Sequence, residues 1–321
     1  MRPVVPMTAA AKPGPALLVA LWLSLIYASC ERSWFLVPSS GPWGGVGITV
    51  LERNIVRARR PIPYMVAIIF VGTCVFSACT YVPAAKAVSC PSGQFSWLTV
   101  MQSDNVQAVL NSDNWNGGTN CETNHGGTAN FTVAQSAGNS TDGPLSYPDI
   151  NVGCEGGYCT TSSGLPAPES SIEPEVTWST TNSPQSGSKF DTGIDSLFAS
   201  SASEGSKPTP SGEVMVLINS SSFSGLGLPY SGPQVFIDGY MWYVRYSSPS
   251  ASREWPYTLF ALAQGSVINS VRSLNMANFY ADAIAHNNLG RGQYLTDIGA
   301  GNEIWANGVG LSTTSLLIAG L

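Results

Sequence analysis

Short apolar runs separated by turn residues recur along the chain from residue 88 onward. They lie at 131–133, 176–178, 214–218, 235–237, 241–246, 257–262 and 311–318. Runs of this length, bounded by Gly, Pro, Ser and Asn, are typical of strands in a β-sandwich or jelly roll. The sequence therefore predicts an all-β, two-sheet jelly roll, with 190–198 as a further core strand and 200–211 as a loop between strands.

One segment departs from this pattern. Apolar residues recur at helical spacing within 270–288, at Val271, Leu274, Ala277, Ala281 and Ile284, and Asn-Asn-Leu-Gly at 287–290 is a helix stop signal. We expect one amphipathic helix here, packed on the convex side of the sandwich.

The charge of the chain is unevenly distributed. Residues from Val88 onward hold 6 of the 14 basic residues and 18 of the 20 acidic ones, a formal balance of 6 − 18 = −12. A segment with this much negative charge disfavours nucleic acid and anionic membranes as partners. The same charge is compatible with a neutral polysaccharide as a partner.

Two apolar runs precede this body, at 16–30 and 65–79. The second follows Arg57, Arg59 and Arg60 and leads to Ala-Lys-Ala at 85–87, which together are typical of a secretory signal and its cleavage site. We therefore expect an N-terminal extension of doubtful start over 1–63, a signal over 64–87 and a secreted domain over 88–321. The alternatives are a two-anchor membrane protein with both runs uncleaved and a lipoprotein cleavage box at 76–79.

Four cysteines remain after the expected cleavage. They are Cys90, Cys121, Cys154 and Cys159, and an even number agrees with disulfides in an exported protein. The short loop from Cys154 to Cys159 is expected to close on itself, which leaves Cys90 to pair with Cys121. The alternative is a metal site, but the only two histidines lack ligand spacing, so we expect no metal and no cofactor.

Two strand-like segments each contain one glutamate in otherwise apolar or small surroundings. Side chains alternate along a strand, so Glu213 shares a face with Met215 and Leu217, and Glu303 shares a face with Trp305. A carboxylate in so apolar a strand needs a partner or an open cleft. Two of them on one concave sheet would form the acid/base pair of a glycoside hydrolase, whereas each alone could be an edge-strand glutamate facing water.

Four motifs occur in a characteristic order. They are Tyr-Pro-Asp-Ile-Asn-Val-Gly-Cys at 147–154, Gly-Glu-Val-Met at 212–215, Gly-Tyr-Met-Trp at 239–242 and Tyr-Leu-Thr-Asp-Ile-Gly-Ala-Gly-Asn-Glu-Ile-Trp at 294–305. Together with the cysteines they resemble glycoside hydrolase family 12, the small β-jelly-roll endoglucanases and xyloglucanases. The resemblance covers about residues 90–321 and implies a concanavalin-like sandwich.

The resemblance also implies three catalytic roles. Glu213 matches the nucleophile, Glu303 the general acid/base, and Asp195 the aspartate that hydrogen-bonds the nucleophile. In such a retaining pair the carboxyl groups lie roughly 5–5.5 Å apart. Two like charges at so short a distance move the pKa values of the two carboxyls apart. The acid therefore stays protonated while the nucleophile is ionised. Between Asp195 and Glu213 we expect a shared proton.

Four further residues are implied as substrate contacts. Met215 matches the methionine beside the nucleophile, and Trp305 belongs to the acid/base motif. Asn111 and Trp115 fall near a glucose-binding Asn-Asn-x-Trp platform, although their spacing is one residue longer. Trp115 and Trp305 are expected to stack on pyranose rings, with ordinary core packing as the alternative for each.

Four positions depart from the family pattern. Leu217, Arg245 and Asn302 stand where the family usually has an aromatic residue, and the disulfide loop, which usually carries an aromatic, reads Glu155-Gly-Gly-Tyr. We expect these changes to alter the sugar subsites while the catalytic trio is kept.

The sequence therefore predicts a secreted, monomeric, retaining endo-β-1,4-glucanase. Its expected partner is a cellulose-like or mixed-linkage β-glucan, and the membrane is a partner only if the apolar runs stay uncleaved. The alternatives are a xyloglucan-specific hydrolase, a non-catalytic or very slow β-glucan-binding jelly roll, and a membrane-anchored structural protein of the envelope.

Overall fold

The computed structural model describes residues 87–90, 94–115, 117–204, 209–221, 232–251, 253–263 and 268–321. The segments predicted over 1–63 and 64–87 lie outside these ranges, apart from Ala87. Within the described residues, no helix has the length and apolar character needed to cross a membrane.

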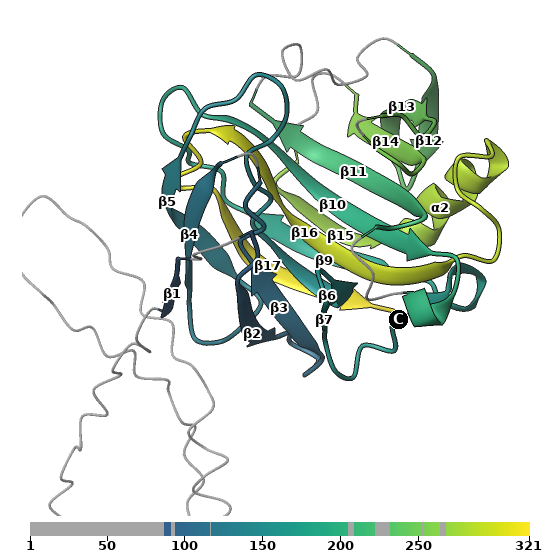
Figure 1. Ribbon diagram of the computed structural model, residues 1–321, viewed down its shortest axis with the longest axis horizontal. Coiled ribbons are helices and arrows are strands. Elements are labelled where there is room, and N and C mark those ends of the chain that lie inside the picture. The colour runs from purple at the N-terminus through teal and green to yellow at the C-terminus, as the bar shows by residue number, and fades with distance from the viewer. Residues whose placement is uncertain are drawn as a thin grey trace, which may run out of the picture. The chain divides into compact units, whose positions relative to one another are not determined.

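Two β-sheets form the described part of the chain (Figure 1). The six-stranded sheet has the order β1 (Ala87–Ser89), β4 (Thr119–Asn124), β5 (Phe131–Ala137), β17 (Ser312–Ala319), β9 (Glu175–Thr180) and β15 (Ser270–Asn275). Each of its pairings is antiparallel.

The eleven-stranded sheet holds the longest strands. Its order is β12 (Gln234–Ile237), β13 (Tyr240–Ser247), β14 (Tyr257–Leu262), β11 (Gly212–Ser220), β10 (Lys189–Ala199), β16 (Tyr294–Ala306), β6 (Asp149–Glu155), β3 (Gln107–Asn111) and β2 (Trp97–Met101), while β7 (Tyr158–Cys159) pairs with β6 and β8 (Ala167–Pro168) with β16. Its strands pair antiparallel except β11 and β14, which are parallel. Two short 3-10 helices complete the elements, η1 (Glu169–Ser171) and η2 (Ala202–Glu204).

Strand β11 divides its side chains between two environments, as its sequence predicts. Val214, Val216 and Ile218 belong to the core between the two sheets, which also contains Trp178 of β9. Met215 belongs to a separate apolar cluster on the opposite face of the sheet. One face of the large sheet thus packs against the small sheet, and the other is available for a cleft, so the predicted two-sheet jelly roll is confirmed.

The helix predicted over 270–288 is shorter than expected. Residues 270–275 form strand β15, and helix α2 comprises only Met276–Ala285. A bulge in β15 places Val271 opposite Trp178 and Leu274 opposite Val176, so two residues three apart face the same side. This bulge imitates helical spacing in the sequence, because a regular strand would put residues three apart on opposite faces.

Helix α2 begins at Asn275, whose side chain caps the backbone N–H of Ala277 at 2.9 Å. Its buried residues are Met276, Phe279, Tyr280 and Ala283. The buried face of the helix therefore differs from the predicted one, since Ala281 is exposed and Ala277 and Ile284 are only half-buried.

The helix packs on the convex side of the large sheet, as predicted. Phe279 meets the rings of Trp242 and Phe260 edge-on, with centroids 5.3 and 5.0 Å away. Both partners belong to the core between the sheets, on the side away from Met215. The helix thus extends the apolar cover of this side and leaves the opposite face open.

The expected disulfides are both present. Cys154 pairs with Cys159, and Cys90 pairs with Cys121. The first closes the loop between β6 and β7, and the second attaches the segment before β2 to β4.

We expect Phe260→Ala to lower the free energy of unfolding by about 3–5 kcal/mol, because it removes a fully buried ring and leaves a cavity. The matched control is Phe236→Ala, whose ring is 67% exposed and whose loss should change the free energy by at most about 0.5 kcal/mol. Urea unfolding of both variants measures the difference. If both variants change the free energy of unfolding by the same small amount, Phe260 does not belong to the core as described.

Candidate active site

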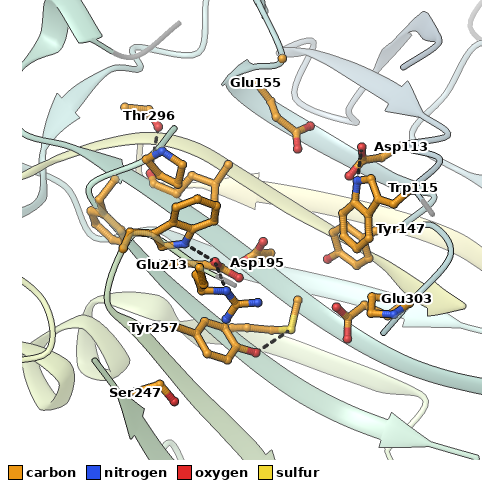
Figure 2. A pocket seen from close by; sticks show the side chains of 18 of the residues that line it. Asp113, Trp115, Tyr147, Glu155, Asp195, Glu213, Ser247, Tyr257, Thr296 and Glu303 are labelled. Carbon is orange, nitrogen blue, oxygen red and sulfur yellow. Dashed lines mark hydrogen bonds and ion pairs between the residues drawn. The ribbon is translucent and has the colours of Figure 1, made fainter. Parts of the chain in front are cut away.

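A cavity of about 830 Å³ lies on the open face of the large sheet. Its walls include strands β10, β11, β16 and β6 and the loop between β13 and β14. Glu213, Glu303 and Asp195 all line it, so the structure brings the predicted trio together. Figure 2 shows Glu213 beside Asp195, with Glu303 across the same cavity.

The strand registers place the trio around β10. Glu213 lies opposite Leu197, Met215 opposite Asp195, and Glu303 opposite Asp191. The two glutamates therefore come from strands on either side of β10 and lie toward opposite ends of it, with Asp195 between. All three side chains reach the one cavity on the concave face.

The Glu213 carboxylate is held by the loop that joins β13 to β14. Trp255 Nε1 donates a hydrogen bond to Oε2 at 2.6 Å, and Arg253 Nε lies 3.8 Å from the same oxygen. The Arg253 guanidinium also lies over the Tyr257 ring, 3.9 Å from its centroid. Tyr257 in turn donates its hydroxyl to Met215 Sδ at 3.4 Å. The contacts of Trp255 and Arg253 therefore reach the same oxygen of the carboxylate, Oε2.

These contacts oppose the effect of burial on Glu213. Burial raises the pKa of the Glu213 carboxyl, and the Arg253 charge and the Trp255 hydrogen bond each lower it. The pKa of Glu213 thus depends on the balance between burial and these two contacts.

Glu303 has a different environment. Burial first, and then the charges of Asp191 and Glu213, raise the pKa of Glu303 to about 8, against a smaller opposing effect of Arg253 and Arg245. Asp191 lies fully buried on the facing position of β10, where burial raises its pKa to about 7. Glu303 is therefore protonated at neutral pH.

Asp195 Oδ1 accepts a hydrogen bond from the backbone N–H of Ser196 at 2.8 Å. The proton expected to be shared between Asp195 and Glu213 stays a prediction. The two carboxyls still interact, because burial and the Glu213 charge raise the pKa of Asp195 well above its usual range. A proton on Asp195 removes a like charge beside Glu213.

The four predicted substrate contacts divide into two pairs. Trp115 lines the cavity with its Nε1 donating to Asp113 Oδ1 at 2.7 Å, and Met215 lines it beside Glu213. Neither Asn111 nor Trp305 is part of the lining. Both side chains are buried, and Asn111 donates a hydrogen bond at 3.2 Å to Glu155, which lines the cavity.

Of the four residues that differ from the family pattern, three lie on the face of the sheet that carries the cavity. Arg245 and Glu155 line it, and Leu217 packs with Met215 on the same face. Asn302 does not, because it is fully buried and accepts a hydrogen bond from Thr192 at 2.8 Å. The expectation that Asn302 alters a sugar subsite is therefore wrong, since residue 302 alternates to the face opposite Glu303.

Several residues of the site were not found by sequence reasoning. Arg253 and Trp255 lie in a loop without periodicity, where no pattern reveals a contact to Glu213. Tyr147 lines the cavity and donates its hydroxyl to the Gly193 carbonyl at 2.9 Å. Its place in the Tyr-Pro-Asp motif was a usable signal. Asp191 could have been found by its alternation with Asp195 along β10.

No metal centre is apparent in the described part of the chain. No group of three or more His, Cys, Asp or Glu side chains there is arranged to hold a metal ion.

Comparison with known proteins gives matches only at the level of structure. No family model and no curated protein matches the sequence. A metagenome-derived family 12 endoglucanase is 22% identical with a TM-score of 0.63, over 74% of this chain and 98% of that chain. An endoglucanase from Rhodothermus marinus is 23% identical with a TM-score of 0.61, over 73% of this chain and 100% of that chain.

A xyloglucanase has the same fold. The family 12 xyloglucanase from Bacillus licheniformis, solved in complex with ligand, is 18% identical with a TM-score of 0.58, over 74% of this chain and 99% of that chain. Identities this low establish a shared fold. The chain therefore has the β-jelly-roll fold of the family 12 endoglucanases and xyloglucanases.

Proposed function

We propose that this chain is a retaining endo-β-1,4-glucanase that cleaves internal bonds of cellulose-like or mixed-linkage β-glucan. The observation that carries the proposal is the contrast between two glutamates in one cavity. Glu213 accepts a hydrogen bond from Trp255 and lies beside Arg253, whereas burial and nearby carboxylates raise the pKa of Glu303 to about 8. Two carboxyls with separated pKa values are what glycoside hydrolysis requires.

In the first step, Glu213 Oε1 attacks the anomeric carbon while Glu303 gives its proton to the leaving oxygen. The glycosidic C–O bond breaks and an ester forms between the sugar and Glu213. Glu303, now a carboxylate, then takes a proton from water, and this water attacks the anomeric carbon and displaces Glu213. Two inversions leave the product with the original β-configuration.

The remaining lining residues bind and position the substrate. Trp115 offers a ring face for a pyranose, held in orientation by its hydrogen bond to Asp113. The fold likeness to endoglucanases supports β-1,4-glucan as the substrate class. The likeness to a xyloglucanase makes xyloglucan the second candidate.

We further propose that the protein is exported. Two disulfides in the described chain are typical of an oxidising compartment. The apolar run at 65–79 supplies a signal of suitable length, so the mature domain begins near residue 88.

The first test is replacement of each glutamate. We expect Glu213→Gln and Glu303→Gln each to lower kcat/KM on a soluble β-1,4-glucan by at least about a hundredfold, because each removes a group that acts in the transition state. Glu254→Gln is the matched control, since Glu254 is exposed beside Arg253 and should leave the rate unchanged. Full activity in either active-site variant would refute its role.

The second test is the stereochemistry of the product. Proton NMR of a cello-oligosaccharide digest should show the β-anomer first, before mutarotation. An α-anomer formed first would refute Glu213 as the nucleophile. Tight binding of the glucan with no turnover would favour the non-catalytic binding protein.

The third test is the pH profile of Arg253 variants. Activity requires Glu213 ionised and Glu303 protonated, so kcat/KM rises with pH through the pKa of Glu213 and falls as pH passes about 8. Arg253 lowers the pKa of both groups, so Arg253→Gln should move both limbs to higher pH. Arg253→Lys keeps the charge and should move them less. Unchanged limbs in Arg253→Gln would contradict the role given to this charge.

A further inference from the structure

One side chain of the cavity takes no part in the proposed reaction steps. Tyr147 lines the cavity although only 4% of the residue is exposed, and Figure 2 shows it between Trp115 and Glu303. In the proposed function, Trp115 stacks on one pyranose and Glu303 protonates the oxygen of the bond that breaks. Tyr147 therefore lies where the reacting ring has to lie, next to the ring that stacks on Trp115.

The backbone of the sheet holds Tyr147 in this place. Its hydroxyl donates to the Gly193 carbonyl at 2.9 Å, at a point where the register between β10 and β11 shifts and the ladder is interrupted. The residue that faces Gly193 on β16 is Gly301, where a Cβ atom would lie 2.3 Å from the carbonyl oxygen of Pro148. A side chain at 301 would therefore push the segment that carries Tyr147 away from the sheet.

The carbonyl that anchors this hydroxyl is central to the proposed catalytic group. Gly193 lies two residues from Asp195 along β10, and two residues in the other direction from Asp191, which faces Glu303. The charges of Asp195 and Glu303 both act on the Tyr147 phenol. The hydroxyl is therefore close to the carboxyl groups that would act on the substrate.

The partner of this hydroxyl fixes its hydrogen-bonding role. A carbonyl oxygen can only accept, so the single proton of the Tyr147 hydroxyl is given to Gly193. Burial first, and then the charge of Asp149, raises the pKa of Tyr147 well above its usual range, so the phenol stays neutral while glucan is hydrolysed. Toward the cavity, its oxygen can then only accept a hydrogen bond.

A hydroxyl of the substrate is the donor that suits this oxygen. The proton on Glu303 is needed at the leaving oxygen, so in the reacting complex it is not available to Tyr147. An unsubstituted glucose ring within a β-1,4-glucan carries hydroxyls on carbons 2, 3 and 6, and each of them can donate a hydrogen bond. An acceptor held rigidly beside the reacting ring would fix the orientation of that ring.

We propose that Tyr147 binds the reacting glucose ring, with its oxygen accepting a hydrogen bond from one ring hydroxyl while its proton stays on the Gly193 carbonyl. The inference rests on the proposed glycosidase function and adds a substrate contact to it. A ring that lacks this hydroxyl leaves the buried oxygen without its donor, so Tyr147 also contributes to the choice of sugar.

A double-mutant cycle between enzyme and substrate tests the contact. The variant is Tyr147→Phe, and the substrates are an aryl β-cellobioside and its three analogues that lack the hydroxyl on carbon 2, 3 or 6 of the ring bearing the aryl group. We expect Tyr147→Phe to lower kcat/KM on the parent by roughly tenfold, because one neutral hydrogen bond is lost. For one analogue, Tyr147→Phe should lower kcat/KM less than about twofold, because the bond is already absent.

The cycle separates the sugar contact from a structural role of the hydroxyl. Loss of the bond to Gly193 lowers kcat/KM by the same factor on every substrate, so only a contact with the sugar gives coupling. The matched control is Tyr280→Phe, which removes a buried hydroxyl 2.9 Å from Ser196 Oγ of the same strand, at a residue that is not among those lining the cavity. It should couple with no analogue. An equal loss on all four substrates in Tyr147→Phe would overturn the contact.

A crystal structure gives a second measurement, which needs no variant of Tyr147. In the Glu303→Gln protein with cellohexaose, the Tyr147 oxygen should lie within about 3.2 Å of a sugar hydroxyl. A complex with no sugar hydroxyl at this distance overturns the contact.

The proposed function is checked separately on the wild type. Hydrolysis of β-1,4-glucan without coupling at Tyr147 overturns the contact alone. No hydrolysis of any β-1,4-glucan overturns the glycosidase proposal, and the cellohexaose complex then decides whether Tyr147 binds the sugar.

Discussion

The pairing of β10 with β11 on one side and β16 on the other determines the geometry of the site. Its register sets Glu213 beside Leu197, Glu303 beside Asp191 and Asp195 between them. Because side chains alternate, the same backbone hydrogen bonds place Val214, Val216 and Ile218 in the core. A slip of one residue would exchange the two faces of the slipped strand, so core packing and the site are specified together.

Electrostatics then distinguishes carboxyls that the strands place on one surface. Burial raises the pKa of Glu213, Asp195 and Glu303 alike, and their roles depend on what lies beside them. Glu213 accepts a hydrogen bond from an indole N–H and lies 3.8 Å from Arg253, and both residues belong to the loop between β13 and β14. The sheet thus brings the acids together, and one loop opposes the effect of burial on the pKa of Glu213.

Much of this could be read from the sequence, because strand periodicity is a local property. The two faces of β11, both disulfides and the grouping of Glu213 with Glu303 are as predicted. The helix start is wrong because a bulge in β15 gives Val271 and Leu274 helical spacing. Arg253 was missed because its contact with Glu213 joins residues forty apart through an irregular loop. Trp305 shares the strand face of Glu303 without being among the residues that line the cavity, so its substrate contact stays a prediction.

The most direct measurement of the central claim is capture of the covalent intermediate on Glu213. A 2-deoxy-2-fluoro cellobioside with a good leaving group slows the second step more than the first, so the sugar should accumulate on the nucleophile. Peptide mapping by mass spectrometry should then find the label on Glu213, and Glu213→Gln should remain unlabelled. A label on Glu303, or turnover of β-glucan with no labelled residue, would contradict this account.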